Sequence, residues 1–121
     1  MNTYEIWCDL ADSSQDLEFC RAVDAYLGFL KGLGTLESFR IRRRKFGFAP
    51  DGWAEFNISI EFTDLTQLDE AFNRVAVRDQ EVESLHKDVF SRIKNGKFAL
   101  YRDFPDPVRA TGDRFGVKQS S

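Results

Sequence analysis

The sequence predicts a single α+β domain in which four antiparallel strands form a sheet and the helices cover one of its faces. Three observations predict this fold: four short segments alternate apolar and polar residues, two longer segments have helical apolar spacing, and turn residues separate them. With 121 residues, 42% hydrophobic and 31% charged, the chain is long and apolar enough for one core. In chain order the segments predict β-α-β-β-α-β, the ferredoxin-like arrangement.

Two different apolar periods predict the first strand and the first helix. Residues 4–10 alternate as a strand does. Asp12 and the serines after it offer capping oxygens for a helix that we expect from about residue 14 to about residue 31. Gly32 and Gly34 supply the backbone freedom that ends this helix. The apolar side of the strand carries Tyr4, Ile6, Cys8 and Leu10, and the helical stripe carries Leu17, Cys20, Val23, Leu27 and Leu30.

The middle of the chain predicts a long hairpin. Residues 36–46 and 54–62 each alternate, and a loop rich in glycine, proline and aspartate separates them. The more regular of the two strands is the second, with four apolar residues in succession on one side. The side chains predicted to lie beneath the helices are Phe39, Ile41, Phe56, Ile58, Ile60 and Phe62.

A second helical region follows, and we expect it to be broken into two pieces. Asp79 interrupts its apolar stripe, and Asn95-Gly96 is expected to end the second piece. The apolar positions are Leu65, Leu68, Phe72 and Val75 in the first piece, Val82, Leu85, Val89 and Ile93 in the second, and Phe98 and Leu100 in a short final strand within residues 97–102.

These elements assign residues 1–102 to the domain, and residues 103–121 differ from them in composition. The last segment has two prolines, two glycines and no apolar period, so we expect an extended C-terminal arm or tail. Its Phe104, Val108 and Phe115 have little to pack against within the domain. The arm is therefore expected to reach a partner subunit.

The sheet face opposite the helices is predicted to be polar and aromatic, and a second copy is predicted to cover it. Large aromatic residues beside rows of opposite charge are typical of a protein interface. The sequence therefore predicts a homodimer that is held by this face. The residues expected there are Glu5, Trp7, Asp9, Arg40, Arg42, Arg44, Glu55, Asn57, Ser59, Glu61, Lys97 and Tyr101.

The order of elements, this face and the segments TDLTQLDEAF (63–72) and VESLHKDVF (82–90) resemble the dimeric α/β-barrel superfamily, particularly its small stress-responsive members. The resemblance spans residues 4–102. It implies a homodimer whose two sheets face each other and enclose a space that many relatives use for small organic molecules. It also implies that a histidine near the second helical region can face a cleft.

The only histidine, His86, is the candidate acid or base. It lies beside the apolar stripe, so a boundary side chain without a catalytic role is the alternative. The two cysteines, Cys8 and Cys20, lie in apolar patterns and are expected to be reduced core residues. No second histidine and no Cys-x-x-Cys spacing is present, and we therefore expect no metal site and no cofactor.

Residues 40–45 hold the concentrated positive charge of the chain, and two interpretations of it stay open. Alternation places Arg40, Arg42 and Arg44 on the open face, and Arg43 towards the helices or a sheet edge. These side chains either pair across strands with Glu55, Asn57 and Glu61, or hold a carboxylate or phosphate by paired hydrogen bonds. The net charge of −3 argues against nucleic-acid binding.

Trp7 and Trp53 are candidates for stacking on a flat ligand, with packing as the alternative. A tryptophan, an asparagine and a histidine also occur in heme-degrading relatives of this fold, but the first strand offers no asparagine that faces the cleft. We therefore predict a ligand site without heme. The predicted ligand-binding residues are Trp7, Arg40, Arg42, Asn57 and Tyr101.

Two functions are consistent with these residues. The first is a dimer that binds a small organic molecule between its paired sheets. The second is a cofactor-free monooxygenase or isomerase-like enzyme for a small aromatic or quinone-like substrate, with His86 as base and Arg42 stabilising an oxyanion. No leader pattern is recognisable and no apolar run approaches the roughly 20 residues of a membrane helix, so we expect a cytoplasmic protein without membrane contact.

Overall fold

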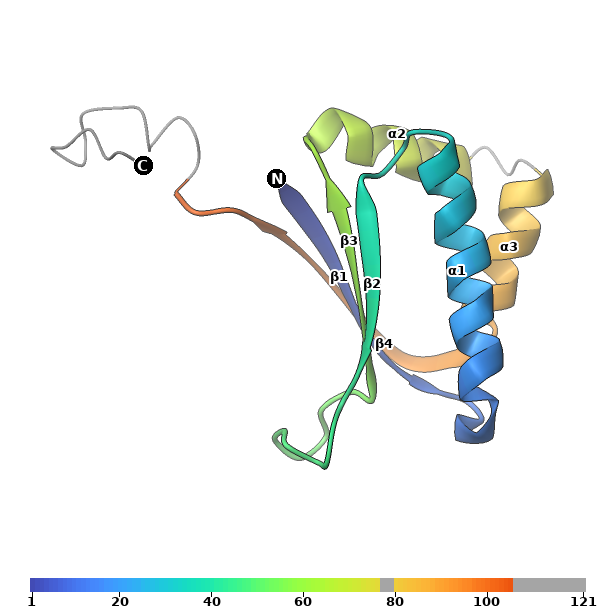
Figure 1. Cartoon of the computed structure of the whole chain (residues 1–121), viewed down its shortest axis with the longest axis vertical. Coiled ribbons are helices and arrows are strands. Elements are labelled where there is room, and N and C mark those ends of the chain that lie inside the picture. Colours follow the sequence, from blue (N-terminus) through green and yellow to red (C-terminus); the bar gives the residue numbers. More distant parts are fainter. Residues whose placement is uncertain (77–79, 106–121) are drawn as a thin grey trace, which may run out of the picture.

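The computed structural model describes residues 1–76 and 80–105, and its four-stranded antiparallel sheet has the order β2-β3-β1-β4. All helices lie on one side of this sheet (Figure 1). The predicted α+β, ferredoxin-like fold is therefore confirmed. The elements are β1 (Asn2–Leu10), a short 3-10 turn η1 (Ser13–Gln15), α1 (Asp16–Gly32), β2 (Ser38–Arg43), β3 (Phe56–Phe62), α2 (Leu65–Ala76), α3 (Gln80–Phe90) and β4 (Ile93–Arg102).

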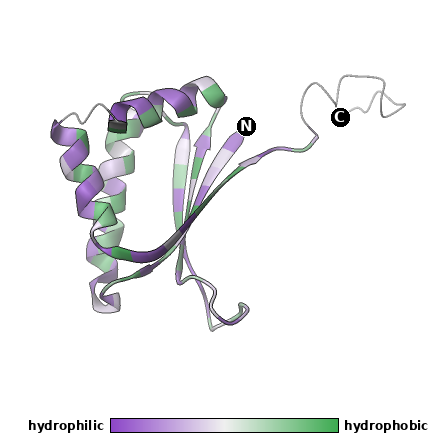
Figure 2. Ribbon diagram, turned by 180° about the vertical axis from the view of Figure 1, so that it is seen from behind, coloured by the Kyte–Doolittle hydropathy of each residue, from purple (hydrophilic) through white to green (hydrophobic). Residues whose placement is uncertain are grey.

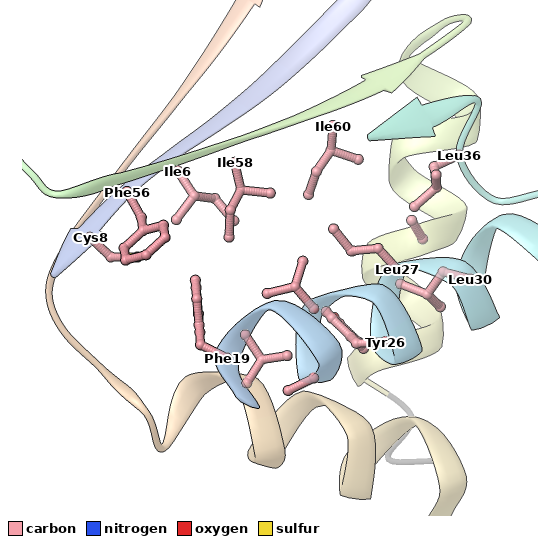
Figure 3. Packing of buried hydrophobic residues seen from close by; sticks show 14 of the residues in the cluster. Ile6, Cys8, Phe19, Tyr26, Leu27, Leu30, Leu36, Phe56, Ile58 and Ile60 are labelled. Carbon is pink, nitrogen blue, oxygen red and sulfur yellow. The ribbon is translucent and has the colours of Figure 1, made fainter. Parts of the chain in front are cut away.

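The core lies between the sheet and the helices. Ile6 in β1 stands opposite Ile58 in β3, so the two side chains share the face towards the helices. The predicted burial of Phe56, Ile58, Ile60 and Phe62 is confirmed, since each is at most 6% exposed. Figure 3 shows Phe56, Ile58 and Ile60 pointing towards the helix layer, where the α1 side chains Phe19, Tyr26, Leu27 and Leu30 lie. Hydrophobic and hydrophilic residues alternate along the strands and helices that build this layer (Figure 2).

Helix α1 differs from the prediction at its cap and in its first turn. The Asp12 carboxylate accepts a hydrogen bond from the Ser14 amide at 3.0 Å and so caps the preceding turn η1, whereas Gln15, the N-cap residue of α1, makes no side-chain capping bond. Leu17, predicted to be in the stripe, is 64% exposed, and Phe19 is fully buried in its place. The Phe19 ring meets the Phe56 ring edge-on at 5.2 Å. A large ring fills the space beneath this turn and leaves Leu17 in solvent.

The second helical region is broken into α2 and α3, as predicted, although Asp79 lies outside the described residues. The expected end of the second piece is wrong. Helix α3 ends at Phe90, and Ile93 already belongs to β4. Asn95, at φ 56°, lies inside β4, where the register against β1 shifts between Trp7 and Asp9. Asparagine tolerates this left-handed backbone, so Asn-Gly here forms a bulge within a strand.

The predicted burial of Phe98 and Leu100 is also wrong, since these side chains are 50% and 47% exposed. Phe98 stands opposite Ile6 and so points to the helix side, as predicted. Strand β4 is an edge strand, however, and helix cover is incomplete there. Phe72 in α2, predicted to be in the apolar stripe, is likewise 46% exposed. Half-exposed aromatic side chains therefore gather beside β4.

Candidate functional site

The open face of the sheet carries all five predicted ligand-binding residues, and four of them line one hollow. The strand register places Arg42, Asn57, Trp7 and Lys97 side by side in one row across β2, β3, β1 and β4. Arg40 lies in the next row, opposite Ser59. Tyr101 follows one row further along β4, opposite Thr3.

Hydrogen bonds link the charged groups of this face. Arg42 Nη2 donates to Asn57 Oδ1 at 2.8 Å and to Ser59 Oγ at 3.2 Å. Asn57 Nδ2 and Ser59 Oγ then donate to the same oxygen, Glu5 Oε1, at 2.9 and 2.7 Å. An amide and a hydroxyl thus connect a guanidinium to a carboxylate, so the charges of Arg42 and Glu5 are balanced within the sheet.

The predicted pairing of the arginine row is confirmed for Arg42 with Asn57 and differs for the other residues. Arg43 faces the helices, as predicted, and forms ion pairs with Asp16 and Glu55. Glu55 therefore forms its ion pair on the helix side, although alternation predicts it on the open face. Arg44 Nη1 donates to the Trp53 carbonyl at 2.6 Å. Within residues 1–76 and 80–105, the Arg40 side chain has no hydrogen-bond or ion-pair partner.

Two hollows meet on the open face at Trp7 and Tyr101. The smaller, of about 280 Å³, is lined by Glu5, Trp7, Arg42, Asn57 and Tyr101. The larger, of about 560 Å³, extends towards the β2–β3 loop and the bulge in β4; its lining includes Trp7, Asp9, Trp53, Asn95, Lys97 and Tyr101. Because both hollows share the side chains of Trp7 and Tyr101, they adjoin each other on the open face, and we call the two together the groove.

Asp9 fixes the end of this groove. Its carboxylate accepts a hydrogen bond from Asn95 Nδ2 at 3.1 Å and from the Glu55 amide at 2.9 Å. These two bonds, the Asn95 bond first, hold the pKa of Asp9 below its usual value. Asp9 therefore joins β1, the start of β3 and the bulge as an ionised group. The alternation of β1 placed Asp9 on the open face, but nothing in the sequence indicated its two partners.

The structure does not bring His86 to the groove. His86 lies in α3, on the helix side, so the sheet separates it from Arg42. Its ring stacks on Phe90 with centroids 4.4 Å apart and meets the Tyr26 ring edge-on at 5.6 Å. Half-burial in this aromatic setting lowers the pKa of His86. Within a single chain, His86 and Arg42 therefore do not converge on one point.

His86 belongs instead to an aromatic cluster with Tyr26 and Phe90, which sequence reasoning missed. A second group of rings lies beside β4. Tyr4 meets Phe72 edge-on at 5.4 Å and stacks on Phe98 at 6.1 Å. Burial, and to a smaller extent the nearby Tyr4, raises the pKa of Tyr26 to about 12. In the part of the chain that the structure describes, the Tyr4 and Tyr26 hydroxyls and the His86 ring have no hydrogen-bond partner.

Cys8 and Cys20 are free thiols, the first buried and the second half-buried. Burial, with smaller contributions from Asp9 and Glu55, raises the pKa of Cys8 to about 11, which keeps it a neutral thiol. The described residues contain no group of three or more potential metal ligands, and none of their helices is both long and apolar enough to cross a bilayer.

Comparison with protein families assigns the chain to one family. Residues 1–115 match the family of unknown function DUF6614, and the protein belongs to that family. A comparison with curated proteins finds no match.

Solved structures of similar fold include proteins that are described as dimeric and ferredoxin-like. A dimeric ferredoxin-like protein of unknown function from Jannaschia sp. CCS1 is 11% identical, with a TM-score of 0.63 over 84% of this chain and 98% of that one. A dabb family protein from Mesorhizobium loti is 15% identical, with a TM-score of 0.62 over 85% and 96%. SnoaB, a cofactor-independent oxygenase from Streptomyces nogalater, is 10% identical, with a TM-score of 0.62 over 87% and 97%. These likenesses show the fold.

Proposed function

We propose that this member of the DUF6614 family is a homodimer that binds a small organic molecule between its two sheets. The groove at Trp7 and Tyr101 carries the proposal, because an uncovered sheet face with two adjoining hollows becomes a chamber when a second sheet covers it. The hollows, about 560 and 280 Å³, are in the size range of small-molecule sites. Self-association is supported by neighbours of this fold that are described as dimeric.

The residues of the groove favour a flat, partly anionic molecule. Trp7 and Tyr101 offer aromatic surfaces for stacking. The Arg42 guanidinium is already held by Asn57 and Ser59, so it acts as a fixed positive group. Arg40 is exposed on the same face, and its donors are uncommitted within the described residues. A planar carboxylate or enolate suits two such guanidinium groups.

Native mass spectrometry of the purified protein tests both parts of the proposal. We expect a dimer of about 28 kDa, twice 14.0 kDa, which retains a small molecule that is released on denaturation. Arg40→Gln should weaken retention of the molecule and leave the dimer intact, and Arg21→Gln, on the exposed side of α1, is the matched control. A wild-type protein that stays at 14.0 kDa at high concentration would exclude the chamber.

A second candidate function is the cofactor-free monooxygenase or isomerase-like enzyme, and the aromatic cluster around His86 favours it. His86, with its lowered pKa, is neutral at pH 7 and able to accept a proton from an acidic C–H or O–H of a substrate. Tyr26, with a pKa of about 12, stays protonated and able to donate a hydrogen bond to the resulting oxyanion. In this candidate enzyme Tyr26, and not Arg42, stabilises the oxyanion.

Oxygen uptake and proton-exchange assays with a panel of small phenols and quinones would test the enzyme. His86→Ala and Tyr26→Phe should each lower any turnover by about 10²-fold or more, the usual range for acid–base groups. Equal turnover by His86→Ala and wild type would exclude His86 as the base. A cytoplasmic location and a stress-related role remain predictions from the sequence.

A further inference from the structure

The β2–β3 loop, residues 44–55, carries three exposed aromatic side chains, two of which lie outside the lining of the proposed groove. Phe46 is 79% exposed, Phe48 is 84% exposed and Trp53 is 55% exposed. The Phe46 and Phe48 rings contact each other edge-on at 6.1 Å, and Lys45 Nζ lies 4.8 Å from the centre of the Phe46 ring. Clustered aromatic groups in water mark a surface that another molecule covers.

Hydrogen bonds within the loop fix its backbone, so the loop holds these rings in solvent. The Phe48 amide donates to the Lys45 carbonyl at 3.1 Å, and the Trp53 amide donates to the Pro50 carbonyl at 3.1 Å. Arg44 reaches across the loop to the Trp53 carbonyl at 2.6 Å. Phe46 has φ 54°, a left-handed conformation that is unfavourable for a bulky residue. A strained backbone that presents two phenylalanines to solvent points to a binding role.

The loop also lies at the border of the groove. Gly52 and Trp53 line the larger hollow together with Trp7 and Tyr101. Figure 1 shows that the loop and the end of β4 project on the side of the sheet away from the helices, at opposite ends of the open face. Tyr101 and Phe104, at the β4 end, are 58% and 78% exposed. Exposed aromatic residues therefore border the open face at both ends.

We infer that the β2–β3 loop packs against a second copy of this chain, so that Phe46 and Phe48 of one subunit help to wall the chamber on the partner's sheet. The inference rests on the proposed homodimer and adds that each site is incomplete without the other subunit's loop. In a two-fold dimer every such contact occurs twice, so two loops enclose two equivalent grooves. Aromatic residues are among those that contribute most to such interfaces.

A second copy fits this surface better than an anionic membrane does. Lys45 and Arg44 would attract anionic headgroups, but the chain carries a net charge of −3 and Asp51 lies in the same loop. A bilayer would also contact only the loop. A second sheet can cover the loop, the groove and the β4 end together, and this continuity favours self-association.

Photo-crosslinking tests where the loop lies. The protein is prepared with p-benzoylphenylalanine in place of Phe48, once unlabelled and once isotope-labelled. The two preparations are mixed, irradiated and digested. We expect crosslinked peptides that join the two labels and connect residue 48 with β1, β3 or β4. A dimer that gives only crosslinks within one copy would overturn the inference and leave the proposed homodimer in place, whereas a monomeric wild type would overturn both.

The strength of association gives a second measurement. Phe46→Ser/Phe48→Ser should raise the dimer dissociation constant about 10-fold or more by sedimentation. Leu17→Ser is the matched control, because Leu17 is 64% exposed on the helix side and its loss should change nothing. Equal dissociation constants for both variants and wild type would overturn the inference. So would a loss of binding to phosphatidylserine vesicles in the double variant without a change in dimerisation.

Discussion

On the open face of the sheet, Arg42, Asn57 and Glu5 are already hydrogen-bonded to one another, whereas on the helix side Tyr26 and His86 have no hydrogen-bond partner among the described residues. The first arrangement fixes side chains in place and balances their charges. The second leaves donors and acceptors available beside exposed rings. The open face is therefore suited to shape recognition and self-association, and the helix side has the groups that acid–base chemistry needs.

The shared core separates these two regions, and a cavity in this core should have the largest effect on stability. Ile58 is 2% exposed between β1 and β2 and supports the helix layer. Ile58→Ala should lower the free energy of unfolding by about 2 to 5 kcal/mol, because the cavity and the lost apolar contacts both contribute. Denaturant melts would measure this. A change below about 0.5 kcal/mol, the range of ordinary surface substitutions, would mean that the faces of β3 are assigned backwards.

The open face is predicted to hold the dimer through its aromatic residues. Trp7→Glu/Tyr101→Glu places two carboxylates where the partner's sheet would lie, so burial would leave them unpaired. Sedimentation at micromolar concentration should move from about 28 kDa, twice 14.0 kDa, towards the monomer mass. The control is Leu33→Glu, beyond the end of α1 and 41% exposed, which should stay dimeric. If both variants remained dimers, the interface would have to lie on another surface.

The hydrogen-bonding contrast itself can be measured by a pair of substitutions. Asn57→Ala removes the link between Arg42 and Glu5 and should cost about 1 to 3 kcal/mol of stability. Tyr26→Phe removes a hydroxyl with no partner in the described chain and should cost less than about 0.5 kcal/mol. Equilibrium unfolding of both variants would compare them directly. A costlier Tyr26→Phe would show that its hydroxyl is engaged in the native protein.

The sequence was sufficient for the fold because its signals are local and agree with one another. The regular alternation in β3 predicted the strand that the structure has, and Asp12, predicted to cap the first helix, caps the turn η1 that leads into it. The wrong predictions concern segments whose local sequence pattern is consistent with two different structures. Asn95-Gly96 ends helices and also forms bulges, and only the pairing of β4 with β1 selects the second. The exposure of Phe98 could not be predicted, because apolar spacing does not reveal how far the helices extend over an edge strand.

The candidate site was predicted in part for the same reason. Alternation correctly placed Trp7, Arg42 and Asn57 on one face, and the register brings them into one row. For His86 the sequence left two roles open, a base or a boundary side chain, because periodicity identifies a stripe on a helix but not which groups on other elements meet it. The cluster of Tyr26, His86 and Phe90 joins α1 and α3, whose contacts are set by tertiary packing alone.

The smallest expected effect is the pH dependence that His86 contributes, and it reports on the helix-side cluster alone. Burial lowers the pKa of folded His86 below the usual value, about 6.5, that it regains on unfolding. The unfolded chain therefore binds the proton more readily, and stability must fall as pH drops through the unfolded pKa. Since His86 is the only histidine, the contribution is isolated by comparing wild type with His86→Gln, in which all carboxylates are retained. Between about pH 7 and about pH 5, wild type should lose more stability than the variant in denaturant melts. Parallel losses in the two proteins would mean that His86 is as solvated in the native state as in the unfolded chain, and would remove the buried, neutral imidazole from the proposed acid–base pair with Tyr26.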